Sequence, residues 1–241
     1  MRVTRHSTST LSRENDMDDT FVVFDCEADP MDQQQFGVQA DRMQCTCACV
    51  ASVPFSKLDH VGGRTPQPES IHKFTCWRDR RGEDGSAPFE RMLVEFDRAR
   101  LICGYNIVNF DFPLLRRYYG KTASADRRYM SHLSKTWDPI NYLLQVTGVM
   151  FKLSDLLRWN SLSQKTASGA KAIEMWTADQ REELELYCQM DVILTMQLCC
   201  MKNLIAVVRG RRVDIPLPSP ALGLLYRTSD WGVGKMHQHG P

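Results

Sequence analysis

FVVFDCEA, at residues 21–28, is an apolar run rich in β-branched and aromatic residues that ends in two carboxylates. Such a run is typical of a buried strand. Two more apolar runs follow at 43–53 and 71–77, with no helical periodicity between them. We therefore expect three consecutive strands in an antiparallel meander.

Beyond residue 88 the pattern alternates between helix and strand, and Pro113 stands where a helix is expected to open. A capping-box spacing, Thr177 to Gln180, precedes the last expected helix. The expected elements are a strand at 101–105 and helices at 88–99, 112–119, 138–147, 151–159 and 178–208. A meander followed by alternating elements predicts an α/β fold: a mixed β-sheet, antiparallel meander plus parallel strands, flanked by helices.

The chain has 241 residues, of which 43% are hydrophobic, enough to bury the core of one domain. We expect this domain at 20–208, with a long Gly- and Pro-containing loop at 55–70. Residues 1–19 read as a disordered polar leader, and 209–241 as a tail that wraps the surface. No run of about 18 apolar residues is present, so no membrane span is expected.

The net charge of +1 excludes a strongly basic, histone-like binder. The nine cysteines lie mostly in apolar runs, which favours reduced thiols in an intracellular protein of the cytoplasm or nucleus. Cys45, Cys47 and Cys49 alternate within one strand. We expect them to pack on one face, because zinc sites favour CxxC-type loops, although a zinc site is the rival interpretation.

Asp25 and Glu27 are two apart in the first strand, so their side chains point to the same face. Two anions in a partly buried place repel one another and lose hydration unless a cation lies between them. The alternative is an ordinary polar strand end.

A third carboxylate, Asp111, lies in a second segment, GYNIVNFDFPLLRRY (104–118), between an expected strand and a helix start. An acidic residue there is often only an N-cap. Asn106 and Asn109 add amide groups suited to holding a phosphate or a sugar.

The third segment is YCQMD (187–191). Asp191 stands in the apolar stripe of a helix, where a carboxylate is costly unless it is paired or bound to a metal. Tyr187 lies one turn earlier on the same face and would ordinarily be a core residue. Oxygen ligands without histidine or cysteine favour Mg²⁺ or Mn²⁺, and two such ions about 3.5–4 Å apart can bracket a scissile phosphate.

FDCE, GYNIVNFDFPLL and YCQMDV resemble the three motifs of the DEDD exonuclease superfamily, which has a ribonuclease H-like fold. The resemblance spans about 20–205 and is nearest to the proofreading exonuclease domain of family-B DNA polymerases. It implies that Tyr187 positions the attacking water, because Leu186 stands where a sister branch has histidine. It also implies two divalent cations, Mg²⁺ or Mn²⁺, with four ligands: Asp25, Glu27, Asp111 and Asp191.

No palm, fingers or thumb follow, so we expect a free-standing exonuclease. The segment 162–176 is similar to free-standing members of the superfamily, and its Lys165 and Lys171 are candidate DNA contacts. Asn109 and the backbone near Phe110 would hold the penultimate nucleotides. The basic stretch 116–128 is a candidate track for a single strand. Its first residues are Arg116 and Arg117. The alternatives are a solvated loop and an ordinary charged helix end.

The resemblance implies a 3'→5' exonuclease that removes nucleoside 5'-monophosphates from single-stranded or frayed 3' ends, with DNA favoured over RNA. An exoribonuclease on the same scaffold is one alternative. A nucleic-acid-binding module that has lost catalysis is another, but the intact carboxylates weigh against it.

Overall fold

The computed structural model describes residues 20–29, 39–58, 70–75, 87–163 and 169–218. The expected leader, most of the 55–70 loop, Lys165 and the end of the expected tail lie outside these ranges. The five strands of the main sheet are β1 (Thr20–Ala28), β2 (Cys45–Pro54), β3 (Ser70–Thr75), β4 (Ala99–Cys103) and β5 (Thr136–Trp137). A separate hairpin consists of β6 (Asn203–Val208) and β7 (Arg211–Pro216).

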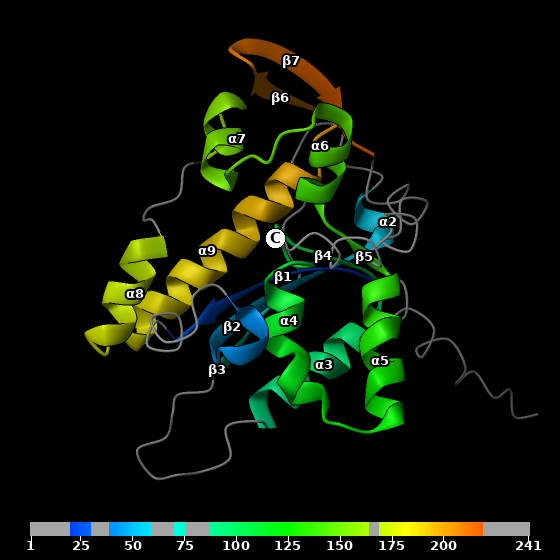
Figure 1. Ribbon diagram of the computed structural model, residues 1–241, viewed down its shortest axis with the longest axis vertical. Coiled ribbons are helices and arrows are strands. Elements are labelled where there is room, and N and C mark those ends of the chain that lie inside the picture. Colours follow the sequence, from blue (N-terminus) through cyan, green and yellow to red (C-terminus); the bar gives the residue numbers. More distant parts are fainter. Residues whose placement is uncertain (1–19, 30–38, 59–69, 76–86, 164–168, 219–241) are drawn as a thin grey trace, which may run out of the picture.

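The described helices pack around these strands (Figure 1). They are α2 (Phe55–Leu58), α3 (Ala87–Arg98), α4 (Asp111–Leu115), α5 (Ala123–Ser134), α6 (Pro139–Thr147), α7 (Leu153–Trp159), α8 (Gly169–Thr177) and α9 (Arg181–Cys199). The 3-10 turns among the described residues are η2 (Ala40–Arg42) and η3 (Arg116–Tyr119). Among the described residues, no helix is long and apolar enough to cross a membrane.

The sheet is mixed, with strand order β3-β2-β1-β4-β5. β1, β2 and β3 form the antiparallel meander, and β4 and β5 add in parallel beyond β1. The predicted α/β fold with a mixed sheet flanked by helices is therefore confirmed.

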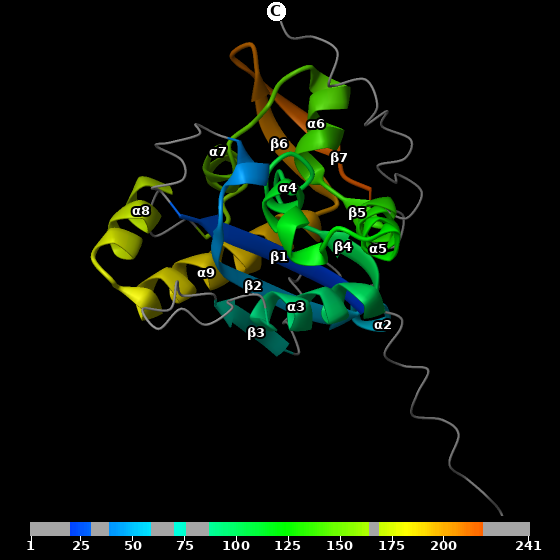
Figure 2. The same cartoon turned by 60° about the horizontal axis from the view of Figure 1, so that its bottom comes forward.

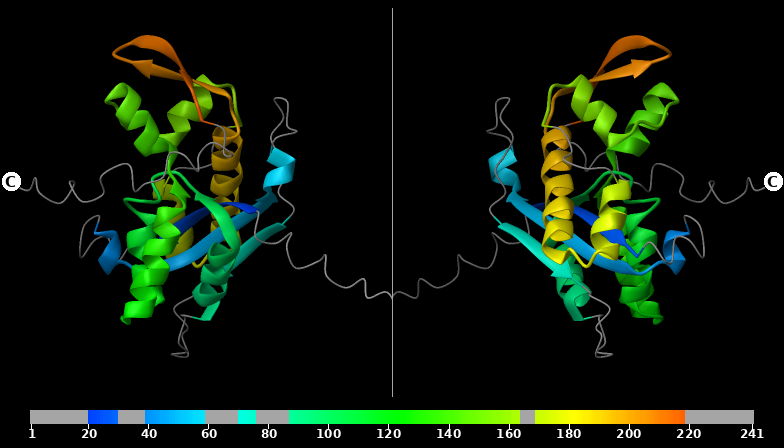
Figure 3. Two further views of the ribbon diagram at one scale, coloured as in Figure 1. Left: turned by 90° about the vertical axis from the view of Figure 1, so that its right-hand side faces the viewer. Right: turned by 90° about the vertical axis from the view of Figure 1, so that its left-hand side faces the viewer.

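Alternating side chains of β1 supply two separate cores. Val22 and Phe24 pack with residues of α3, α4 and α5. Phe21 and Val23 pack with residues of α9 on the other face. Figure 3 shows α9 above the strands and α3 and α5 below them. Alternate side chains of β1 thus contact different helices: Val22 and Phe24 contact α3, α4 and α5, whereas Phe21 and Val23 contact α9.

The predicted helix at 178–208 is wrong at its C-terminal end. α9 stops at Cys199, and residues 203–208 form β6 instead. Arg209 and Gly210 both have positive φ and join β6 to β7 in a two-residue hairpin turn. Only Lys202 and Asn203 are polar between Leu198 and Val208, and this concealed the end of the helix. The expected tail accordingly begins with the turn and a paired strand.

The predicted capping box at the start of α9 is also wrong. Thr177 ends α8, where its hydroxyl donates to the carbonyl of Ile173 at 2.8 Å. Asp179 turns the chain with a φ of 60°, and Gln180 precedes α9 without a side-chain cap. α8 itself begins at Gly169, within the segment 162–176.

α5 was not expected from the sequence, although a local signal for it exists. Thr122 is its N-cap, and the Thr122 side chain accepts a hydrogen bond from the Ala125 N–H at 3.1 Å. Polar residues dominate the segment, and their apolar neighbours give only a weak helical stripe.

Candidate active site

The two carboxylates of β1 lie on the face of the sheet that packs against α9. Phe21 and Val23 pack against this helix, so Asp25 and Glu27 continue the same face at the end of the strand. One carboxylate oxygen of each and the Sγ of Cys188 in α9 lie within 4.8 Å of one another. The predicted same-face pair is therefore present and is held against a helix.

Asp111 joins this pair because β4 is shorter than β1. β4 pairs only with Thr20–Val23, so the later part of β1 has no β4 neighbour. Beyond that point the N–H of Cys26 donates to Asp111 Oδ1 at 2.8 Å. Asp111 is 3% exposed and lies beside the strand between Asp25 and Glu27.

Gly104 lets the chain leave β4 close to β1. A Cβ at this position would lie 2.6 Å from the carbonyl oxygen of Phe24 and 2.2 Å from Cγ2 of Ile107. Only glycine fits so close an approach. The segment that follows Gly104 carries Asp111 to its place.

The N-cap alternative for Asp111 does not hold. Phe110 is the N-cap of α4, and no side-chain capping bond is present there. Burial raises the pKa of Asp111 to about 7, opposed in part by the Cys26 N–H and reinforced by the charge of Asp138. A cation beside the carboxylate would favour its ionised form.

Asp138 is a positioning residue that the sequence analysis missed. It accepts hydrogen bonds from the N–H groups of Asn106 at 2.9 Å and Val108 at 3.1 Å, and it also caps α6 through Ile140. It thereby fixes the loop that leads to Asp111. Burial raises its pKa to about 7 as well. The Asp-Pro pair before a helix was the available signal.

α9 brings the remaining two predicted residues to the end of β1. Asp191 is 4% exposed within a largely buried helix. Burial raises the pKa of the Tyr187 hydroxyl, and the charges of Asp191, Glu27 and Asp25 and a hydrogen bond with Asp191 raise it further. The hydroxyl of Tyr187 therefore lies among three of the four predicted carboxylates and stays protonated.

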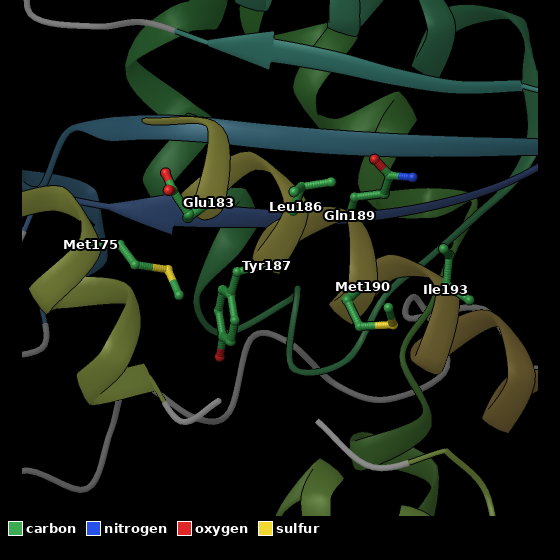
Figure 4. A pocket seen from close by; sticks show the side chains of 7 residues that line it. All are labelled: Met175, Glu183, Leu186, Tyr187, Gln189, Met190 and Ile193. Atoms are coloured by element: carbon green, nitrogen blue, oxygen red, sulfur yellow. The ribbon is translucent and has the colours of Figure 1, made fainter. Parts of the chain in front are cut away.

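A cavity of about 380 Å³ opens beside Tyr187 between α8 and α9. Figure 4 shows Met175 of α8 near the Tyr187 ring, with Met190 on the same side of α9 and Gln189 on the other. The full lining is Met175, Glu183, Leu186, Tyr187, Gln189, Met190 and Ile193. This mostly apolar cavity falls in the size range of small-ligand sites.

The predicted amide contacts lie in the loop before α4. Asn106 has a φ of 68°, which asparagine tolerates better than most residues. The Asn109 side chain donates to the Asn106 side chain at 3.1 Å. Phe110 is half-buried and packs against the core that includes the apolar side chains of α4.

The predicted cationic contacts have partners within the chain. Arg116 forms an ion pair with Asp126, and Arg117 donates to the carbonyl of Met43 at 3.2 Å. Lys171 forms an exposed ion pair with Glu174 at 2.8 Å. Lys165 lies outside the described residues.

The two tyrosines of the basic stretch 116–128 are turned inward. Tyr118 packs on Phe89 with ring centroids 4.4 Å apart, and buried Tyr119 is hydrogen-bonded to His132. The ring of Tyr119 is therefore buried, whereas Tyr118 is partly exposed. Nucleic-acid contact through Arg116 and Arg117 stays a prediction.

No protein-family model matches the sequence, and no curated protein matches it. Solved structures do match. The family B DNA polymerase from the archaeon Pyrobaculum calidifontis is similar over 75% of this chain, with 20% identity and a TM-score of 0.51. A structure of exonuclease I matches over 75% of this chain with 15% identity and a TM-score of 0.49. E. coli exonuclease I in complex with an oligonucleotide matches over 70% with 18% identity and a TM-score of 0.42.

The chain spans 24% of the polymerase, and 40% and 42% of the two exonuclease I chains. The likeness to the polymerase agrees with the resemblance of the three sequence motifs to family-B polymerases. The chain shares its α/β fold, a mixed sheet flanked by helices, with a family-B DNA polymerase structure.

Proposed function

We propose that this protein is a 3'→5' exonuclease that hydrolyses the terminal phosphodiester bond of single-stranded or frayed DNA. The observation that carries the proposal is one convergence of side chains. Asp25 and Glu27 of β1 face α9, where Asp191 and Tyr187 lie. Asp111 of α4 reaches the same strand through the Cys26 N–H.

The donor set fits two divalent cations, Mg²⁺ or Mn²⁺. The four carboxylates offer only hard oxygen ligands, and Asp111 and Asp191 are nearly buried. So much negative charge in one buried place is costly unless cations compensate it. When bound, the ions would activate the attacking water and stabilise the leaving 3'-oxygen.

Tyr187 supports catalysis as a hydrogen-bond donor. Its hydroxyl stays protonated because burial and three carboxylates raise its pKa. A protonated phenol beside carboxylates is suited to orienting a water molecule and is a poor cation ligand. We assign it the positioning of the nucleophile.

The cavity beside Tyr187 suits the base of a terminal nucleotide. Met175 and Met190 provide polarizable apolar walls without a dense set of polar groups, so one base is not strongly preferred over another. A paired end must unstack and unpair to enter, which costs a few kcal/mol. Single strands and mismatched 3' ends should therefore be degraded faster than paired ends.

The test is a 5'-labelled single-stranded oligonucleotide, as DNA and as matched RNA, incubated with the protein and Mg²⁺ or Mn²⁺ and resolved on a sequencing gel. A descending ladder supports the proposal, and EDTA should stop it. Immediate release of a labelled mononucleotide, or cuts within a circular single strand, would contradict it. Faster trimming of the RNA would identify the exoribonuclease alternative.

A further inference from the structure

The interface between α9 and the sheet carries two groups of thiols. Cys199 of α9 faces Cys103 of β4, with their Sγ atoms 3.2 Å apart. Three turns earlier, Cys188 faces Cys47 and Cys49 of β2. The first group offers two sulfur atoms and the second offers three.

A β-bulge separates Cys45 from Cys47 and Cys49. Glu27 pairs with Cys47 but Ala28 pairs with Cys45, so β2 has one extra residue at this point. Cys45 consequently packs in the core on the opposite face of the sheet, while Cys47 and Cys49 face α9. The expectation that all three cysteines share one face is therefore wrong for Cys45.

We propose that Cys47, Cys49 and Cys188 form a binding site for a thiophilic divalent cation of the zinc class. Their Sγ atoms all lie within 4.8 Å of one another, and all three residues are fully buried. A Zn–S bond of ~2.3 Å in a tetrahedral site places its sulfur atoms ~3.8 Å apart. The trio thus needs to contract by no more than about 1 Å, a small side-chain adjustment.

Asp25 is the candidate for the fourth position. Its Oδ2 lies 3.9 Å from the Cys188 Sγ, on the side of the catalytic carboxylates. Elsewhere on this face β1 and β2 present only carbon side chains, such as Val23, Ala51 and Val53. The three thiols therefore lie beside the carboxylates at the end of β1. As soft thiolate ligands they would select zinc over Mg²⁺. The alternative is that the thiols only pack as small hydrophobic groups.

The site can be tested by titrating the reduced full-length protein with Co²⁺ alone and recording the near-ultraviolet sulfur-to-cobalt charge-transfer absorption. Oxygen ligands do not produce this absorption, so the carboxylate site is silent in the measurement and activity is not needed. We expect a saturable signal that Zn²⁺ displaces. Cys47→Ala and Cys188→Ala should each weaken Co²⁺ binding at least as much as the roughly 10- to 100-fold lost with an outer-sphere partner.

Two variants serve as matched controls. Cys45→Ala removes a buried thiol of the same strand from the other face, and Cys103→Ala removes one from the two-sulfur group. Both should keep the signal, and circular dichroism should show that all four variants are folded. No charge-transfer absorption in the wild type, or an equal signal in Cys47→Ala and Cys45→Ala, would overturn the site in favour of simple packing.

Discussion

Asp191 is the residue at which packing and chemistry conflict most directly, because a helix with buried neighbours on both sides carries a carboxylate that is 4% exposed. Asp191→Asn keeps the shape and removes the charge. We expect hydrolysis to fall by at least roughly 10²- to 10³-fold, the scale of one lost electrostatic contact in the transition state. In EDTA the free energy of unfolding should rise, because a buried charge is removed.

Hydrolysis rates measured with Mg²⁺ test the first part of this prediction, and urea denaturation in EDTA tests the second. Asp155→Asn is the control, since Asp155 lies in α7 and pairs with Arg158 at 2.9 Å. Near-normal turnover of Asp191→Asn would mean that Asp191 is not a metal ligand.

Tyr187→Phe keeps the ring and removes only the hydroxyl. Because the hydroxyl orients water in this account, kcat should fall by roughly 10- to 10³-fold. Metal affinity, measured by calorimetry, should change little. A large loss of metal affinity would instead make Tyr187 a ligand, and an unchanged kcat would make it a core residue.

At the residue level, the sequence marks candidate site residues where a side chain contradicts its surroundings. Asp191 breaks an apolar stripe, and Asp25 and Glu27 end an apolar strand. Asp138 gave no such contrast, because an aspartate before Pro139 is an ordinary helix start. The hydrogen bonds that Asp138 accepts from the Asn106 and Val108 N–H groups depend on a tertiary contact that the local sequence does not encode.

At the scale of elements, the approach of the β4–α4 connection to β1 decides whether Asp111 reaches the site. Gly104→Ala would place a Cβ 2.6 Å from the Phe24 carbonyl oxygen. The two segments must separate, so we expect lower stability and a loss of activity larger than the stability change explains. The measurements are thermal unfolding and nuclease rate at a temperature where the variant is folded.

Gly148→Ala is the control for this change. Its Cβ would meet no atom within 4 Å, so only the strain of its φ of 70° remains. If Gly104→Ala were as active as Gly148→Ala, the close approach would not matter for the site.

A second element-scale prediction concerns the contact between α3 and α5. His132 of α5 is hydrogen-bonded to Tyr119 at 2.7 Å and to Asp97 at 2.8 Å. Burial lowers its pKa from 6.5 to about 4, although Asp97 opposes this shift. Between these values the unfolded chain binds the proton and the folded chain does not, so acidification favours unfolding.

The free energy of unfolding should therefore fall as the pH decreases from 6.5 to about 4. In His132→Gln this part of the dependence should be absent, giving a shallower slope in the same window. Urea denaturation at several pH values provides the slopes. Equal slopes for the two proteins would show that His132 titrates alike in the folded and unfolded chains.

The elements themselves were predictable to the extent that their patterns were local. β1, α3, α6 and α7 follow from apolar periodicity and proline positions. The end of α9 was not predictable from periodicity, because only Lys202 and Asn203 interrupt the apolar residues between Leu198 and Val208, where β6 follows the helix. The bulge that separates Cys45 from Cys47 has no sequence signature and arises from strand pairing.

For the whole molecule, the sheet brings together predicted ligands that are far apart in the chain. Asp25 and Glu27 of β1 face α9. Because β4 ends before this part of β1, Asp111 can accept a hydrogen bond from the Cys26 N–H at the edge of the strand. The sequence motifs predict which residues take part, but the distances between them follow from the packing of α9 and α4 on the sheet. Figure 2 shows α9 and α4 on the two sides of β1.

The central claim is that these carboxylates hold cations that contact the scissile phosphate. Its most direct test compares oligonucleotides that carry oxygen or sulfur at one non-bridging position of the 3'-terminal phosphodiester. Mg²⁺ binds sulfur poorly and Mn²⁺ tolerates it better. We predict that sulfur slows hydrolysis strongly with Mg²⁺ and that Mn²⁺ restores much of the rate for at least one diastereomer. An equal effect of sulfur with both ions, for both diastereomers, would contradict direct contact between the bound cations and the phosphate.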